Sequence, residues 1–164
     1  MEKYLPPKKG TRHVLRVIRE LLAFQPTQHG TNISAALAYL GKVQRRSSIC
    51  FLISDFISPD FSHEATLIAQ RHDLISIAVI DPSEKAFPQM DLVNFVDLET
   101  GQHSLVDTSS TTTHENLKKS LEQRIASLKD LMIRAGAAFI PLYTDQPYLP
   151  ELRKFFKIRG KRRL

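Results

Sequence analysis

Apolar residues gather in three runs whose length and composition predict β-strands. The most pronounced run, Ile49–Ile53, has five consecutive apolar residues and leads directly into a polar segment. An uninterrupted apolar run of this length is typical of a strand buried on both faces, as in a parallel sheet covered by helices. The second run is Leu74–Ile80 and the third is Ala138–Tyr143. In the third run Pro141 favours an edge position, because proline cannot donate a hydrogen bond to a neighbouring strand.

The stretches between these runs show helical spacing, in which every third or fourth residue is apolar. We predict helices in five stretches: after Gly10, after Thr31 and Asn32, after Ser58 and Pro59, from Thr112 to Gly136, and from Tyr148 to Phe156.

Strands that alternate with helices predict an α/β domain with a mostly parallel, doubly wound, Rossmann-like sheet flanked by helices. We expect residues 1–164 to form this single domain, with a β-hairpin of Leu92–Leu98 and His103–Val106 at one edge of the sheet. Two helices precede the first strong strand, whereas a Rossmann-like domain usually opens on its central strand. We therefore expect the first central strand to be missing.

Composition narrows the class of protein without indicating a function. The 164 residues are 42% hydrophobic and 24% charged, which is ordinary for a globular protein. No apolar run approaches the roughly 20 residues of a membrane helix, and the first residues contain no apolar signal core. Cys50 is the only cysteine, so no internal disulfide can form. We expect a cytoplasmic protein that does not contact a membrane.

The formal net charge of +6 comes from a basic C-terminal tail, residues 153–164, which has seven bases and no acid. Such a tail can bind nucleic acid or an acidic partner, here through Arg159, Lys161, Arg162 and Arg163. It is also explained as the solvated end of a helix, where cations complement the helix dipole. We favour the second interpretation and do not expect nucleic-acid binding.

Oxygen-bearing side chains follow the predicted strands, at the edge where open α/β sheets bind ligands. Ser54 and Asp55 come after the first strand, Asp81 comes after the second, and Thr31 opens a helix that can reach the same crevice. Hard cations such as Mg²⁺ prefer oxygen ligands. Thr31 and Asp55 are therefore candidate metal ligands, with Ser54 and Asp81 as accessory residues, although acids at strand ends also serve as turn and cap residues.

A metal-dependent nuclease or phosphoesterase is the alternative function. It would use Asp55, Asp81 and Asp145, the acid after the third strand, and the basic tail would hold phosphates. Two-metal chemistry of this kind needs carboxylates that converge on one point. A hydrolase site of Ser54, Asp55 and His72 is not expected, because side chains of adjacent residues at a strand end diverge.

Short motifs along nearly the whole chain resemble a known family. They are Tyr4–Gly10, Gly30–Asn32, Ala35–Leu37, Ile53–Phe56, Arg71–Asp73, Asp81–Glu84, Asp97–Gly101, and Phe155–Phe156 with Arg159. In this order they are similar to domain of unknown function family 58, a bacterial, MoxR-associated group. The C-terminal half of that family resembles a von Willebrand factor A domain.

The resemblance implies a Mg²⁺ or Mn²⁺ ion at the top of a central sheet, in a metal-ion-dependent adhesion site. In the family its ligands come from a D-x-S-x-S motif, a threonine and an aspartate. Thr31 matches the threonine and Asp55 the aspartate. The D-x-S-x-S motif lies upstream of the PPKKG segment in the family, and this chain starts after it. We therefore expect an incomplete site and no ion bound in this chain.

The resemblance also implies a function and a partner. It indicates a non-enzymatic protein-interaction module that works with a MoxR-type AAA+ ATPase in the assembly or remodelling of protein complexes. A missing first strand would leave the Ile49–Ile53 strand with an open apolar edge, and such edges invite pairing with another chain. We therefore also expect a homodimer or a swapped assembly.

Overall fold

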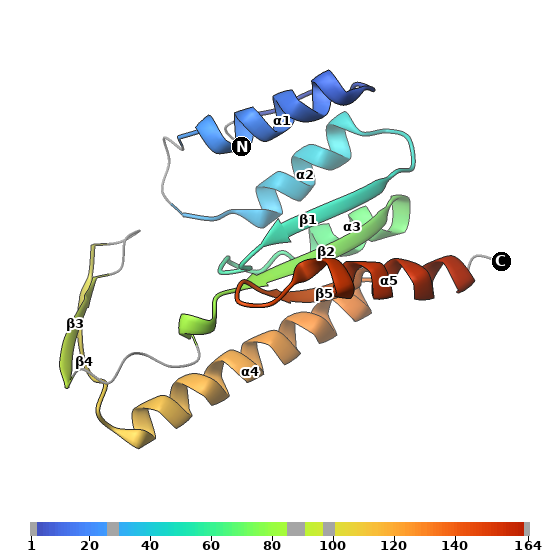
Figure 1. The fold of residues 1–164 in the computed structure, drawn as a ribbon. Helices are drawn as coiled ribbons and strands as arrows, with labels where there is room; N and C mark the ends of the chain where they lie inside the picture. Colours follow the sequence, from blue (N-terminus) through green and yellow to red (C-terminus); the bar gives the residue numbers. More distant parts are fainter. Residues whose placement is uncertain (1–2, 26–29, 85–90, 97–100, 163–164) are drawn as a thin grey trace.

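The fold is a mixed α/β arrangement in which helices pack around a small parallel sheet (Figure 1). The computed structural model describes residues 3–25, 30–84, 91–96 and 101–162. Its helices and strands follow one another as α1 (Thr11–Ala23), α2 (Ile33–Val43), β1 (Ile49–Ser54), α3 (Ser62–Arg71), β2 (Asp73–Ile80), the short 3₁₀ helix η1 (Pro82–Glu84), β3 (Leu92–Val96), β4 (His103–Asp107), α4 (Thr111–Arg134), β5 (Ala138–Tyr143) and α5 (Tyr148–Arg162).

The main sheet contains three parallel strands in the order β1–β2–β5. Ile49 of β1 lies opposite Asp73 of β2, and Ile75 of β2 lies opposite Ala138 of β5. The predicted parallel sheet is thus confirmed, and so is the edge position of the strand that contains Pro141. Within the described residues β1 forms the other edge of this sheet, because it pairs with β2 alone.

Helices cover the two faces of the sheet unequally. On one face α2, α3 and α4 enclose the larger core, which includes fully buried Ala65 and Met132. On the other face α5 is the one described helix that packs against the smaller cluster around Ile75, through Leu152 and Phe155. Alternate side chains of β2 enter each cluster, so this strand is buried on both faces.

The predicted burial of β1 on both faces is wrong. Cys50 and Leu52 point into the larger core, but Ile49, Phe51 and Ile53 are exposed, Ile53 to 63%. Among the described residues, α5 meets β1 where the ring of Phe156 lies against that of Phe51, 6.2 Å away between centroids. An apolar run does not reveal that the element needed to cover one of its faces is absent from the described chain.

The predicted placement of the hairpin at an edge of the main sheet is also wrong. Strands β3 and β4 pair with each other and form a separate two-stranded antiparallel sheet. Figure 1 shows this hairpin beside the N-terminal end of α4 and apart from the main sheet. Part of the predicted first strand and its turn, residues 97–100, lies outside the described residues.

Helix α1 forms where its apolar spacing predicts it, but none of its residues is buried. Its apolar stripe is exposed, with Leu22 at 84%. The N-terminal segment holds the helix through an ion pair between Lys3 and Glu20, and through Tyr4, whose ring meets that of Tyr39 of α2 edge-on at 5.7 Å. None of the described helices combines the length and the apolarity that a membrane span requires.

Met132 of α4 tests the packing of the larger core. It is fully buried, and its Sδ accepts a hydrogen bond from the Ser76 hydroxyl at 3.1 Å. We expect Met132→Ala to lower the free energy of unfolding by about 2–5 kcal/mol, because it leaves a cavity. It also removes the partner of a buried hydroxyl. The adjacent, exposed Ile133 is the matched control, and Ile133→Ala should cost about 0.5 kcal/mol or less in urea denaturation. Equal losses for the two variants would contradict the core assignment.

Candidate functional site

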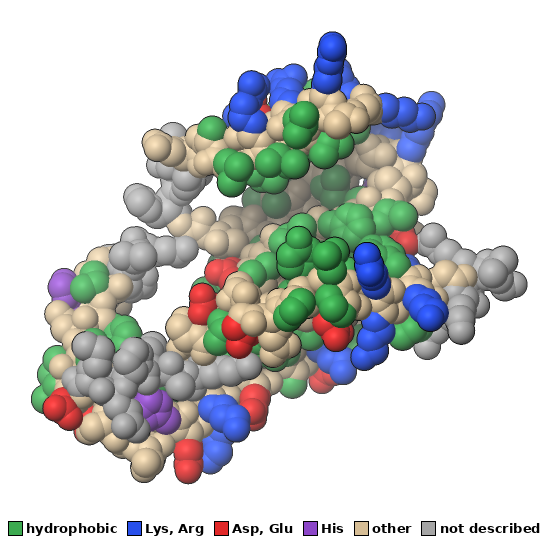
Figure 2. Space-filling view, viewed as in Figure 1, with side chains coloured by type: hydrophobic (Ala, Val, Ile, Leu, Met, Phe, Trp, Pro, Cys, Tyr) green, Lys and Arg blue, Asp and Glu red, His purple; other side chains and the backbone are tan. Residues whose placement is uncertain are grey.

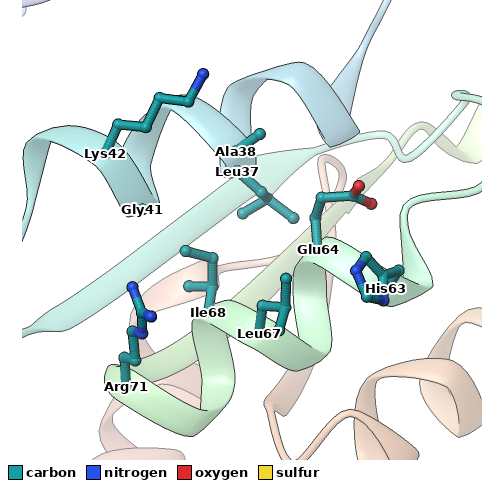
Figure 3. A pocket seen from close by; sticks show the side chains of 9 residues that line it. All are labelled: Leu37, Ala38, Gly41, Lys42, His63, Glu64, Leu67, Ile68 and Arg71. Atoms are coloured by element: carbon teal, nitrogen blue, oxygen red, sulfur yellow. The ribbon is translucent and has the colours of Figure 1, made fainter.

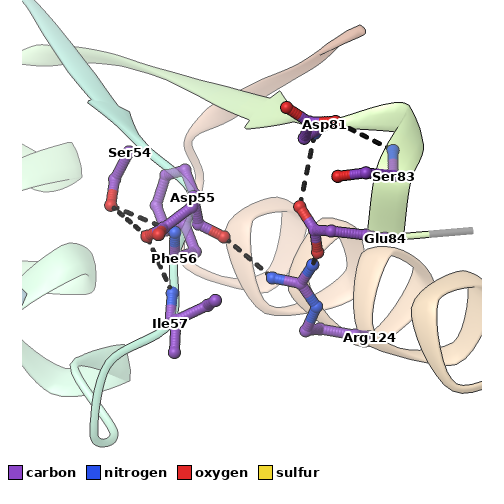
Figure 4. Close-up of polar contacts among 8 residues, drawn as sticks. All are labelled: Ser54, Asp55, Phe56, Ile57, Asp81, Ser83, Glu84 and Arg124. Carbon is purple, nitrogen blue, oxygen red and sulfur yellow. Dashed lines mark hydrogen bonds and ion pairs between the residues drawn. The ribbon is translucent and has the colours of Figure 1, made fainter. Parts of the chain in front are cut away.

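The candidate site is the rim formed where the parallel strands end and their carboxyl termini share one edge of the sheet. Asp55 follows β1, Asp81 follows β2 and Asp145 follows β5. The loop after β5 is tied to the end of β2, since the Thr144 amide donates to the Ile80 carbonyl at 3.0 Å. Figure 4 shows the part of this rim that carries Asp55 and Asp81.

The start of α2 reaches the same rim. The Asn32 side chain caps this helix by accepting from the Ala35 amide at 2.8 Å, as Asx residues do at helix N-termini. The Ile33 amide donates to the Ser58 hydroxyl, 3.3 Å away in the loop after β1. Half-buried Thr31 therefore belongs to a segment that touches the loop of Asp55. Coordination of one ion by both residues stays a prediction.

The carboxylate of Asp55 shapes the loop in which it lies. Its Oδ1 accepts from the Ile57 amide at 3.1 Å and from the Ser54 hydroxyl at 3.2 Å, and Ser54 Oγ accepts from the Phe56 amide at 3.0 Å. Phe56 has a φ of 60°, which is uncommon for a bulky residue. Its buried ring packs against Phe61 at 5.8 Å, and this packing stabilises the unusual backbone.

Asp81 is engaged in a local turn that leads into η1. Its Oδ1 accepts from the Ser83 amide at 2.8 Å, and its own amide donates to Glu84 Oε1 at 3.3 Å. Hydrogen bonds from the hydroxyl and the amide of Ser83 hold the pKa of Asp81 below its usual value. Asp81 therefore acts in this structure as a turn residue.

Arg124 of α4 is the rim residue that the sequence interpretation missed. One Nη donates to the Asp55 carbonyl oxygen at 3.0 Å and the other pairs with the Glu84 carboxylate (Figure 4). One guanidinium thus ties the loop after β1 to η1. The sequence shows only that Arg124 lies directly before Ile125, which packs on the larger core. This position does not reveal which distant residues Arg124 contacts.

The described donors do not suit a divalent cation by themselves. Thr31 and Asp55 offer one hydroxyl and one carboxylate, whereas Mg²⁺ takes six ligands in near-octahedral geometry. Among the residues with described positions, no three His, Cys, Asp or Glu side chains come together in a way that could hold a metal. The Arg124 guanidinium also adds positive charge beside Asp55. A complete ion site would need oxygen ligands from outside the described residues.

Two other candidate groups have structural roles. His72 Nδ1 lies 3.2 Å from the hydroxyl of Ser48, which precedes β1, so His72 is at the opposite end of the strand from Ser54 and cannot complete a hydrolase site with it. In the basic tail, Arg159 pairs with Asp73 and lies over the Phe155 ring at 5.6 Å. The side chains of Lys161, Arg162 and Arg163 lie outside the described residues.

Helix α5 is longer than the predicted Tyr148–Phe156 and includes most of the basic tail, which was interpreted as a helix end. Helix α5 continues beyond Phe156 to Arg162, because lysine and arginine are good helix formers. Helix α4 starts at Thr111, one residue before the predicted start, with Ser110 as N-cap and no capping side-chain bond.

A groove of about 330 Å³ lies between α2 and α3 (Figure 3). Its apolar wall includes Leu37 and Leu67, with Lys42 and Arg71 at one end and Glu64 at the other. It shares no lining residue with the rim. No buried polar group is directed into it, so it offers no second candidate site.

Arg124 can be tested as the clamp of the rim. We expect Arg124→Ala to lower the free energy of unfolding by about 1 kcal/mol, since two partly exposed, charge-assisted hydrogen bonds are lost. The amides of Phe56 and Ile57 should then exchange hydrogen faster. Lys119→Ala removes an exposed ion pair from the same helix and is the control, which should leave these amides unchanged. Unchanged exchange in Arg124→Ala would contradict the clamp.

The turn at Asp81 predicts a pH dependence. Because the folded-state pKa of Asp81 is lowered, its contribution to stability is present above the unfolded-state pKa and is lost as the pH falls through the folded-state pKa. Ser83→Ala should raise the pKa of Asp81 in an NMR titration of the carboxyl carbon. An unchanged pKa would show that the Ser83 hydroxyl has no part in the shift.

Comparison with known proteins places this chain in a family described as one of unknown function. The family model described as "Protein of unknown function DUF58" matches residues 1–126. An uncharacterized protein of Mycobacterium avium is 25% identical over 159 residues, covering 94% of each chain. Uncharacterized proteins of Mycobacterium bovis and Mycobacterium tuberculosis are 23% identical over 162 residues, which is 96% of this chain but 50% of theirs. No solved structure matches significantly. The chain belongs to the DUF58 family.

Proposed function

We propose that this chain is a non-enzymatic protein-interaction module of the von Willebrand factor A-like type, and that its partner contacts the rim at Thr31, Ser54 and Asp55. The observation that carries this proposal is the contact between the Ile33 amide and the Ser58 hydroxyl at 3.3 Å. It brings the start of α2, which follows Thr31, to the loop after β1, which contains Ser54 and Asp55, and so it supports a shared contact surface for these residues.

The layout of the sheet supports the von Willebrand factor A-like, Rossmann-like assignment at a general level. Parallel strands covered by helices on both faces place their connecting loops at one edge, which is where open α/β sheets bind ligands. The finer assignment rests on the motif resemblance and remains part of the proposal.

The rim residues favour binding over the alternative nuclease or phosphoesterase. The Asp55 and Asp81 carboxylates each accept hydrogen bonds within their own turns, and the Arg124 guanidinium bridges the Asp55 carbonyl and Glu84. Two-metal chemistry requires carboxylates that converge. In the part of the chain that the structure describes, the acids after β1 and β2 serve local turns instead.

We further propose a MoxR-type AAA+ ATPase as the partner, from the family resemblance, with a cytoplasmic role in the assembly or remodelling of protein complexes. The described donors do not suit Mg²⁺ or Mn²⁺ alone, so this chain contacts the partner with its own rim side chains. Asp55 is exposed and charged, and it can pair with a base on the partner.

Rim variants test the proposal. Asp55→Asn and Thr31→Val should each weaken binding to the MoxR-type ATPase of the same genome at least about tenfold, a loss of about 1.4 kcal/mol. Biolayer interferometry with this chain immobilised measures the affinity. Asp145→Asn is the matched control, because it removes an exposed acid at the same sheet edge but after β5.

Unchanged affinity in both rim variants would overturn the proposed contact, and a loss in the Asp145 control of the same size would show a nonspecific charge effect. Titration of this chain with Mg²⁺ in a calorimeter should give no saturable binding below millimolar concentration, because the fixed oxygen ligands are too few. Tight, stoichiometric binding would contradict our assessment of the donor set.

A further inference from the structure

A second groove, which we call the edge groove, lies at the first half of β5. It has a volume of about 440 Å³ and is lined by α4 and α5, the helices that cover opposite faces of this strand (Figure 1). Ile133 of α4 and Ile158 of α5 line its two sides, together with Phe139 of β5 and Phe155 of α5. The two isoleucine side chains are 57% and 51% exposed. Exposed apolar side chains that line a common groove mark an interaction site.

The edge groove opens on the side of β5 that faces away from β2. Phe156 of α5 meets Phe51 of β1, so this side of the helix is directed toward β1. Ile158 lies two residues further on, about 160° around the helix, and therefore on the opposite side. Since the same groove is also lined by Ile133 on the other face of the sheet, it follows the outer edge of β5.

The backbone of β5 gives the groove a hydrogen-bonding edge. Among the described residues β5 pairs with β2 alone. The Thr144 amide donates to the Ile80 carbonyl, and because backbone direction alternates along a strand, Phe139 directs its amide and carbonyl away from β2. An outward amide and carbonyl on one residue can pair with one residue of an added antiparallel strand. Pro141, the next outward residue, has no amide hydrogen, so strand addition is confined to the first half of β5.

The charge of the edge groove favours an acidic occupant. Its described lining residues include two bases, Lys129 and Arg159, and no acid. Arg159 pairs with Asp73, whereas Lys129 is exposed and forms no ion pair with another described residue. Figure 2 shows further Lys and Arg side chains over the C-terminal half of α5, a helix that has no acid after Glu151. Charge complementarity at an interface steers association and disfavours partners of like charge.

The same bases disfavour a second copy of this chain as the occupant. Two β5 strands paired about a two-fold axis would bring Lys129 and Arg159 of both copies to one junction. Like charges that meet at an interface cost free energy. Both α4 helices would also lie on the same face of the joined sheet. A separate strand that carries acids avoids both problems.

We propose that the edge groove binds an extended, acidic segment of a partner protein, which adds to the first half of β5 as an antiparallel strand. The residue opposite Phe139 faces Ile133 of α4, because Phe139 itself packs toward the larger core. The residues on either side of it face Ile158 of α5, and a flanking acid pairs with Lys129. The proposal is independent of the proposed function, because the groove lies at the start of β5 and the rim lies where the strands end.

Peptide selection tests the class of occupant. The natural chain is immobilised and exposed to a phage library of random linear peptides, and phage that also bind an Ile133→Ser, Ile158→Ser double variant are removed. The two isoleucines are already exposed, so this variant should stay folded. We expect the enriched peptides to combine alternating apolar residues with at least one Asp or Glu. Enrichment of basic peptides, or no enrichment at all, would overturn the proposal.

Binding of one enriched peptide, measured by fluorescence anisotropy, tests the ion pair. Lys129→Glu should weaken binding at least about tenfold, and replacing the acid of the peptide by lysine should restore the affinity for this variant. Lys118→Glu is the matched control, because it makes the same charge change at an exposed position of α4 outside the groove. It should change the affinity less than about twofold. Equal losses in the two variants would contradict the pairing with Lys129.

N-methylated peptides test the added strand. Methylation of the peptide amides on the edge that faces β5 should abolish binding, whereas methylation of the intervening amides should not. The Phe139 amide should also exchange hydrogen more slowly in the complex. Equal effects of the two methylation patterns, with unchanged exchange at Phe139, would rule out strand addition. A dimer at micromolar concentration that the peptide converts to a monomer would overturn the proposal in favour of a second copy as the occupant.

Discussion

The structure depends on the burial of β2, the one described strand that is paired on both edges and covered on both faces. Its alternate side chains join two separate cores, and Ser76 is the polar exception that donates to Met132 in the larger core. Because β1 and β5 are aligned on β2 in parallel register, the loops after all three strands emerge at one rim. The position of each candidate site residue follows from this alignment.

The rim and the open edge of β1 both follow from the alignment of the strands on β2, but they are stabilised differently. At the rim, Arg124 donates a hydrogen bond to the loop after β1 and forms an ion pair with Glu84 of η1. These two contacts tie the loop to η1. Along β1 no comparable device is present among the described residues, and three apolar side chains remain in contact with solvent. The rim is thus stabilised within the chain, whereas the outer edge of β1 pairs with no other strand among the described residues.

Much of the fold was predictable because local patterns determine it. Helical spacing located five helices, and apolar runs located the three parallel strands with Pro141 at an edge. The burial of β1 was predicted wrongly because an apolar run shows the preference of a strand, not the presence of a covering helix. The hairpin was misplaced because its pairing is local and says nothing about the main sheet.

The candidate site was predictable only in part. Strand-end acids were found because parallel strands share an edge, but Arg124 acts across 69 positions of sequence from Asp55, and no local pattern encodes that contact. The local turns that contain Asp55 and Asp81 could be predicted from the sequence, because they involve neighbouring residues. The positive charge of Arg124 beside them could not.

Hydrogen exchange of the β2 amides, compared with that of the β1 amides, tests the central claim most directly. We expect the β2 amides to exchange only on global unfolding, whereas the β1 amides that are directed away from β2 should exchange much faster. Equal protection of the two strands would contradict the claim that the structure depends on β2.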